Sequence, residues 1–249
     1  MATTMASAAD RKSSERRFYS WMAIALVIVM FLGFAPSFYL RGYVNLPRPN
    51  PTLPPAVLLH GILFTLWMLL LVVQTQLISS RKHELHMRLG KAGMLLAILL
   101  VPVMYLTAVW QVARANQPPM TDPLTWTIVP LAVIIPFAVL VWKGWSKRRD
   151  VQSHKRLMLG AAILVVAGPA VGRLPLAPPT LGGMTFLLLL GLALFVPLFL
   201  WDRRSQGRVH PATKLGFGLG LVSVLVPLAV FWTGADWASV ARQLPGVAA

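Results

Sequence analysis

The chain alternates between long apolar runs and short polar connectors, and seven of the runs have the length of a membrane-crossing helix. Crossing a bilayer as a helix takes about 20 consecutive apolar residues. The pattern predicts helices at residues 18–40, 55–78, 89–110, 124–142, 157–174, 181–201 and 215–232. Because these runs are continuous rather than alternating, they argue against a membrane β-barrel. We therefore predict an all-α polytopic bundle of seven transmembrane helices.

The apolar pattern divides the chain into three parts. Residues 1–17 carry Ala, Ser and Thr with four basic side chains, and we expect them to form a disordered basic cytoplasmic tail. The first apolar run follows a basic leader as in a signal peptide, but it is longer than a signal core of about 7–15 residues. We expect a transmembrane domain at residues 18–233 and a short outer C-terminal segment at residues 234–249.

The charges predict the orientation of the bundle. Hydrophobic residues make up 57% of the chain and charged residues only 12%, whereas a soluble domain carries about 25% charged residues. The net charge of +16 does not indicate nucleic-acid binding, because 18 of the 23 Lys and Arg residues lie in the tail and in every second connector. This asymmetry predicts a cytoplasmic N-terminus and an outer C-terminus, as in a bacterial inner-membrane protein. Basic clusters at a cytoplasmic face also predict contact with anionic lipids.

Three basic connectors each contain a histidine close to the start of the next apolar run: His86, His154 and His210. If the hairpins pack side by side, these imidazoles approach one another at one face of the membrane. Three imidazoles suit zinc, copper or iron, and a catalytic zinc site typically has three protein ligands. The sequence therefore predicts a candidate metal site, with a divalent metal or haem as the cofactor to consider.

The same connectors also support two other interpretations. Their many cations oppose a bound metal ion, and helix N-termini favour anions. The histidines then cap helices among lipid headgroups, or they bind an anionic headgroup or substrate. The acidic residues of these connectors, Glu84, Asp150 and Asp202, either complete a metal site or orient the imidazoles.

A second candidate site lies toward the opposite face. His60 is predicted inside the second helix near its outer end, and an ionisable side chain at membrane depth suggests function. Arg173 is predicted near the outer end of the fifth helix, where with His60 and Tyr39 it suits a quinone carbonyl or an anionic group. The alternatives are helix packing for the His60–Gln74 face and snorkelling to the interface for Arg173.

Several short motifs resemble a family of uncharacterised multi-pass inner-membrane proteins of proteobacteria. The resemblance covers nearly the whole chain outside the tail and rests on segments 34–39, 59–61, 74–75, 86–90, 154–158 and 207–213. It implies an inner-membrane location and the topology above, and it implies no activity.

The sequence thus leaves three functions open. The first is an accessory or binding role with a histidine cluster at the cytoplasmic side. The second is a metal- or haem-dependent membrane oxidoreductase, and the third is a small transporter that uses the His60–Gln74 face. The chain has no phosphate-loop, dinucleotide, zincin or serine-hydrolase motif. The sequence does not identify a protein partner.

Overall fold

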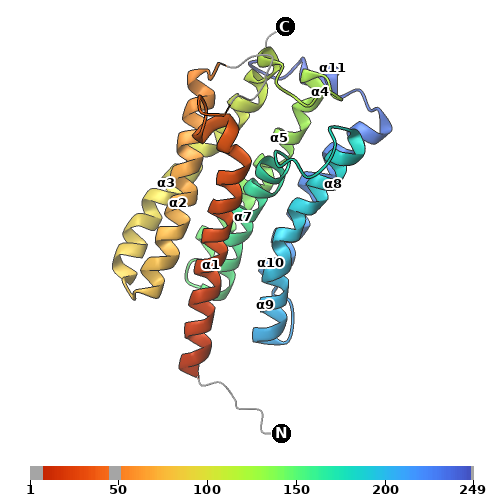
Figure 1. The fold of residues 1–249 in the computed structure, drawn as a ribbon. Helices are drawn as coiled ribbons and strands as arrows, with labels where there is room; N and C mark the ends of the chain where they lie inside the picture. Colours follow the sequence, from red (N-terminus) through yellow and green to blue (C-terminus); the bar gives the residue numbers. More distant parts are fainter. Residues whose placement is uncertain (1–7, 45–51, 248–249) are drawn as a thin grey trace.

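The computed structural model describes residues 8–44 and 52–247, which form an all-helical bundle (Figure 1). Seven helical spans are long and apolar enough to cross a membrane, so the predicted seven-helix architecture is confirmed. In chain order the elements are α1 (Ala8–Phe34), η1 (Ala35–Tyr39), α2 (Pro55–Ser79), α3 (His83–Trp110), η2 (Val112–Arg114), α4 (Pro123–Trp126), α5 (Ile128–Ala132), α6 (Ile134–Ser146), α7 (Val151–Val171), α8 (Leu181–Leu192), η3 (Ala193–Phe195), α9 (Val196–Gln206), α10 (Pro211–Thr233) and α11 (Trp237–Ala241).

Helix α7 is the centre of the bundle. In its apolar window 72% of the residues are buried, against 11% in α2. It contacts α1, α6, α8 and α10, and small residues allow two of these helices to approach closely. A Cβ added to Gly33 of α1 would lie 2.7 Å from Ala170 Cα, and one added to Gly191 of α8 would lie 2.7 Å from the Ala167 carbonyl carbon. Small residues therefore set the spacing of α1 and α8 against α7.

Most helices at one end of the bundle begin earlier than the apolar pattern predicts. Helix α1 starts at Ala8 rather than at residue 18, so part of the expected tail is helical. Helix α3 starts at His83 rather than at residue 89, and α7 starts at Val151 rather than at residue 157. The apolar run marks only the part of each helix that suits the membrane core. The polar first turns continue the same helices, as where Asp150 accepts hydrogen bonds from the Gln152 and Ser153 amides.

Three spans contain a break in the regular α-helix. The fourth is interrupted at Thr127 and Val133, between α4, α5 and α6. The sixth passes through the 3₁₀ turn η3 directly before Pro197, and the first ends in the π-helical turn η1, which contains Pro36. Proline removes a backbone donor and favours such irregular turns.

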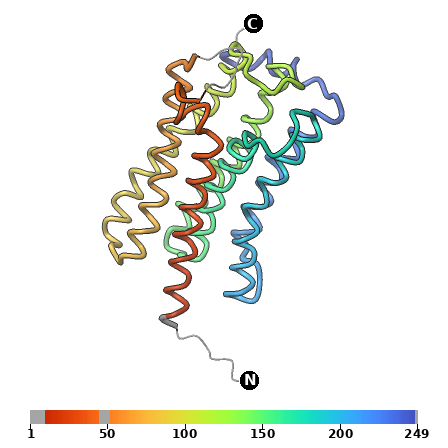
Figure 2. Tube along the Cα trace, in the orientation of Figure 1, coloured from red at the N-terminus to blue at the C-terminus, as the bar shows by residue number. Residues whose placement is uncertain are grey.

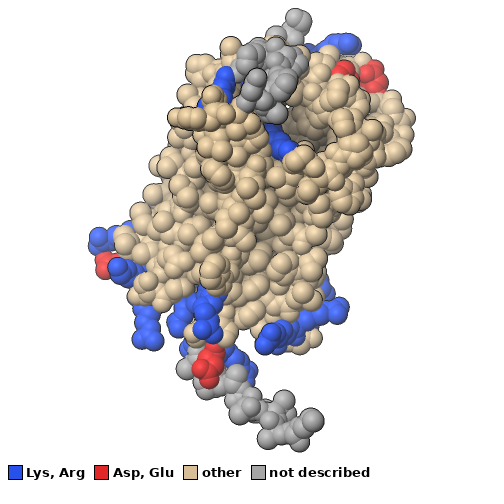
Figure 3. All heavy atoms as spheres, in the orientation of Figure 1, with Lys and Arg blue, Asp and Glu red and all other residues tan. Residues whose placement is uncertain are grey.

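Basic side chains gather at one end of the bundle, which we call the basic end (Figure 3). It consists of the first turns of α1 and the connections α2–α3, α6–α7 and α9–α10. The described chain starts at this end and finishes with α11 at the opposite end, as expected for an odd number of spans (Figure 2). Residues 45–51 of the proline-rich connector between the first two spans lie outside the described residues.

Candidate functional site

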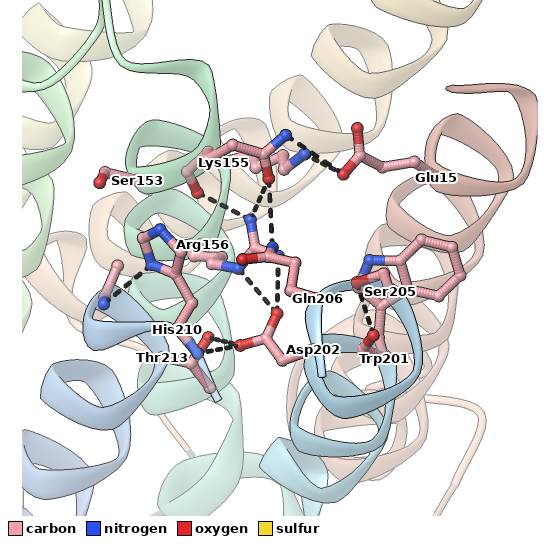
Figure 4. A network of polar contacts seen from close by, with 12 residues as sticks. Glu15, Ser153, Lys155, Arg156, Trp201, Asp202, Ser205, Gln206, His210 and Thr213 are labelled. Atoms are coloured by element: carbon pink, nitrogen blue, oxygen red, sulfur yellow. Dashed lines mark hydrogen bonds and ion pairs between the residues drawn. The ribbon is translucent and has the colours of Figure 1, made fainter. Parts of the chain in front are cut away.

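A buried ion pair joins two of the basic connections. Arg156, in the second turn of α7, and Asp202, near the end of α9, both have side chains that are 0% exposed. Arg156 Nη2 lies 2.6 Å from Asp202 Oδ1, and Arg156 Nε donates to the same oxygen at 2.8 Å (Figure 4). Arg156 Nη1 donates to the backbone and side-chain oxygens of Gln152, at 2.9 and 2.6 Å.

The second carboxylate oxygen of Asp202 holds the start of α10. It accepts from the His210 amide at 2.9 Å and from Thr213 Oγ1 at 2.6 Å (Figure 4). A buried carboxylate is tolerated only where its charge is paired and its lone pairs are satisfied, and both conditions are met here. The cluster therefore connects α7, α9 and α10 through a single acidic side chain.

A second ion pair brings α1 to the same cluster. Lys155 Nζ pairs with Glu15, and the Lys155 ammonium also lies 5.0 Å from the centre of the Tyr19 ring. On the neighbouring face of α1, Phe18 stacks on Trp201 of α9 with ring centres 4.6 Å apart. These contacts explain why α1 continues beyond the membrane-spanning run into the expected tail.

His210 has a structural position. It is the N-cap of α10, where Nδ1 of its ring accepts from the Ala212 amide at 3.1 Å. Burial lowers the pKa of His210, and the charge of Arg156 lowers it further, which favours the neutral ring that this cap requires. For His210 the capping interpretation of the sequence is confirmed.

His86 and His154 lie side by side instead. Their ring centres are 6.4 Å apart and the ring planes are perpendicular, at 88°. His86 occupies the first turn of α3 and His154 the first turn of α7, yet neither is an N-cap, since Lys82 and Asp150 take those positions. The packing of α3 against α6, and of α6 against α7, brings these two turns together.

The two rings differ in their contacts with neighbouring helices. His154 Nδ1 lies 2.8 Å from the Gly144 carbonyl oxygen, and a carbonyl only accepts, so Nδ1 carries a hydrogen and the lone pair of the neutral ring is on Nε2. The His86 ring lies close to the backbone of Gln74, and its Nδ1 is buried without a partner. The Gln74 side-chain oxygen is also buried without a partner.

The predicted trio of histidines is thus divided into a pair and a cap. Within residues 8–44 and 52–247, no group of three or more His, Cys, Asp or Glu side chains is placed to hold a metal ion. The three connector carboxylates are used elsewhere: Glu84 pairs with Arg88 at 2.6 Å, Asp150 caps α7, and Asp202 binds Arg156.

The second candidate site lies toward the opposite end. His60 packs on Phe64 with ring centres 4.7 Å apart, and its Nδ1 is buried without a partner. The charge of Arg173 is close enough to act on His60, while its guanidinium lies 4.5 Å from the centre of the Phe34 ring. Tyr39 is engaged with Thr65 of α2 through a hydrogen bond of 2.8 Å. Arg173 and Tyr39 are therefore both engaged with other side chains, and the pocket that they would share with His60 stays a prediction.

A layer of buried aromatic side chains separates His60 from Gln74. Trp67 and Phe137 are 3% and 0% exposed, with ring centres 5.2 Å apart, and Phe64 adjoins Phe137 at 6.2 Å. This packing fills the face of α2 between the two polar residues. A transport path along that face would require these rings to move.

The sequence pattern did not predict that Arg156 is buried, and it assigned this residue to a solvated basic connector. One signal was present: Arg156 directly precedes the apolar run that starts at Leu157. A charge at the edge of an apolar run requires a partner if the helix is central.

No protein-family model, curated protein or solved structure matches this chain.

Proposed function

We propose that the chain is an integral protein of a bacterial inner membrane with a cytoplasmic N-terminus, and that its role is to bind a ligand at the cytoplasmic face. The location and orientation are supported by the seven apolar spans, by the excess of Lys and Arg at one end, and by the resemblance in the connector motifs. The observation that carries the binding role is the pair His86 and His154, in which His154 Nδ1 is fixed by the Gly144 carbonyl and His86 Nδ1 is buried without a partner.

Capping accounts for only part of this pair. The His210 ring satisfies the first turn of α10, and His154 Nδ1 satisfies the Gly144 carbonyl near the end of α6, whereas His86 Nδ1 is buried without a partner. His86 and His154 lie half-buried at the basic end, with an unsatisfied ring nitrogen and an unsatisfied amide oxygen next to them. Unsatisfied buried acceptors are costly, so a bound group that supplies a cation or a donor would stabilise the site.

The orientation is tested by labelling with a membrane-impermeant maleimide. The chain contains no cysteine, so Ser80→Cys at the basic end and Ala235→Cys at the opposite end each introduce one exposed thiol. In intact spheroplasts the label should reach residue 235 and not residue 80, and in inverted vesicles the result should be reversed. The opposite pattern would overturn the proposed orientation.

The binding role is tested by native mass spectrometry of tag-free protein extracted without chelator. The native chain should carry a non-covalent mass that the double variant His86→Ala/His154→Ala lacks, while lipid adducts remain in both. Equal adducts in the two proteins would contradict a ligand site at this pair. The variant His83→Ala is the control, because His83 is exposed in the same turn as His86.

Anionic lipids are the second proposed partner. The basic end holds 18 of the 23 Lys and Arg residues, and a cation near an anionic membrane surface contributes about 1 kcal/mol. Phosphatidylglycerol should therefore raise the melting temperature of the detergent-solubilised protein more than phosphatidylcholine does. An equal effect of both lipids would contradict this partner.

The alternative functions remain proposals of lower rank. A metal- or haem-dependent oxidoreductase would use the same histidine pair, and a Soret band in the purified protein would favour it. A small transporter would use the His60–Gln74 face, where Trp67 and Phe137 are closely packed.

A further inference from the structure

We propose that His86, His154 and Gln74 form a site for a divalent first-row transition-metal ion, with zinc as the probe. The inference rests on the proposed binding role of the histidine pair and assigns a chemical class to its ligand. It requires neither His210, which caps α10, nor a carboxylate ligand.

The available atoms at this place are all acceptors. His154 offers Nε2, because its Nδ1 hydrogen is directed at the Gly144 carbonyl. His86 offers Nδ1, and Gln74 offers its side-chain oxygen, both buried without partners. Two imidazole nitrogens and an amide oxygen supply lone pairs and no hydrogen, so they suit a cation. Imidazole in particular suits zinc and its first-row neighbours.

The spacing of the rings is close to that of two ligands on one ion. With metal–nitrogen bonds of about 2.0–2.1 Å, two imidazoles on a tetrahedral zinc have ring centres roughly 5 Å apart. The observed separation is 6.4 Å, so a side-chain rotation of modest size closes the site. Gln74 lies beside the same part of α3, because its side-chain nitrogen lies 3.5 Å from the position of a Cβ on Gly90, one turn after His86.

The anchor of the His154 ring also fits a metal site. A histidine that binds a metal usually donates its other ring hydrogen to a carbonyl or a carboxylate, which fixes the ring orientation and the tautomer. The Gly144 carbonyl has this role for His154, which leaves Nε2 of that ring for a ligand. His86 contributes its partnerless Nδ1.

Ion pairs reduce the positive field that opposes a bound cation. Three of the basic residues near the histidines are matched by a carboxylate: Arg88 by Glu84, Lys155 by Glu15, and Arg156 by Asp202. Three protein ligands would leave one position of a tetrahedral ion open to water or a substrate.

Zinc binding is measured on tag-free apo-protein in detergent, by competition with a chromogenic chelator and by elemental analysis after desalting. We expect one zinc ion per chain. The variants His86→Asn and His154→Asn should each lower the affinity by about 100-fold or more, the upper end of what loss of a ligand's supporting group costs. Gln74→Leu should lower it by about 10-fold. X-ray absorption of the zinc-loaded protein should show imidazole scattering that each histidine variant reduces.

Two matched controls separate this site from surface binding. His83→Asn removes an exposed histidine from the same turn, and Gln76→Leu alters an exposed glutamine on the same helix as Gln74. Both should leave the affinity unchanged. Melting of each apo-variant reports whether it is folded, and Gln74→Leu keeps the test valid if a histidine variant is unstable.

Sub-stoichiometric zinc, or zinc affinity that is equal in the native chain and in the folded histidine variants, would overturn the metal assignment. If the native chain then still carries a non-covalent mass that depends on the pair, only the ligand class is wrong. If that mass is also missing, the proposed binding role fails as well.

Discussion

Arg156 and Asp202 form an ion pair that is completely shielded from solvent, with Nη2 and Oδ1 2.6 Å apart. It lies where α7, the central helix, meets α9 and α10, and it satisfies the His210 amide and Thr213 as well. Removing one member of such a pair leaves an uncompensated charge, whereas replacing both with apolar residues removes the charge altogether.

We therefore expect Asp202→Ala to lower the free energy of unfolding by about 3–5 kcal/mol. The double variant Arg156→Met/Asp202→Leu should be less destabilised than the single variant. Unfolding in mixed detergent micelles, followed by circular dichroism, measures both. The control is Glu84→Ala, since the Glu84–Arg88 pair is about three-quarters exposed and such pairs contribute at most about 1 kcal/mol. Equal losses for Asp202→Ala and Glu84→Ala would contradict the prediction.

The N-cap at His210 predicts a dependence of stability on pH. Burial, with the Arg156 charge, places the folded pKa of His210 below the unfolded value of about 6.5. The folded state then binds fewer protons than the unfolded state, so the contribution of the neutral ring is fully present above the unfolded pKa. This contribution to stability is lost as the pH falls from the unfolded pKa through the folded pKa of His210.

The variant His210→Asn keeps a capping side chain and removes this titration. Between about pH 7 and pH 5 the melting temperature of the native chain should fall more steeply than that of the variant. Parallel curves would show that His210 does not contribute. The variant His83→Asn, which changes an exposed histidine of another connector, should follow the native curve.

The apolar pattern predicts the seven spans because the membrane selects for long uncharged runs, and it locates α2 to within one residue at each end and the start of α8 to the residue. It does not predict the first turns of α3 and α7, since interfacial helix is polar and resembles a loop in composition. Nor does it distinguish His210 from His86 and His154, because all three histidines lie in basic connectors. That distinction depends on which helices are neighbours, and hydrophobicity alone does not encode the order of helices in a bundle.

Arg156 illustrates the same limit. Its sequence context matches that of Arg88, since each follows a histidine by two residues and precedes a leucine. Arg88 is exposed, whereas Arg156 is buried, because α7 is central and α3 is not. Burial of a charge is decided by tertiary packing, and the local motif carries no information on it.

Close helix contacts predict opposite effects for two classes of glycine. A Cβ on Gly191 would meet the backbone of Ala167 in α7, whereas a Cβ on Gly218 of α10 would meet nothing within 4 Å. Gly191→Ala should therefore force α8 away from α7 and lower the free energy of unfolding by about 1–3 kcal/mol. Gly218→Ala should be neutral or stabilising by up to about 1 kcal/mol, because alanine favours the helix. Unfolding in mixed micelles compares the two variants directly, and equal effects would contradict the crossing geometry.

The C-terminal helix α11 covers the break in the fourth span, where Trp237 Nε1 donates to Thr127 Oγ1 at 2.9 Å. Thr127 is 0% exposed, and Tyr105 holds the following residues by donating to the Pro245 carbonyl at 2.9 Å. The variant Trp237→Phe keeps the ring and removes the donor, so it should destabilise the attachment of α11 by about 1 kcal/mol. Because α11 ends just before Arg242, trypsin should then cleave after Arg242 several times faster than in the native chain.

The matched control is Trp232→Phe, which removes an equivalent indole bond to Thr185, at 3.0 Å, from an exposed position on α10. Cleavage after Arg242 should not change in that variant, and equal acceleration in both would show that the bond to Thr127 does not hold the segment.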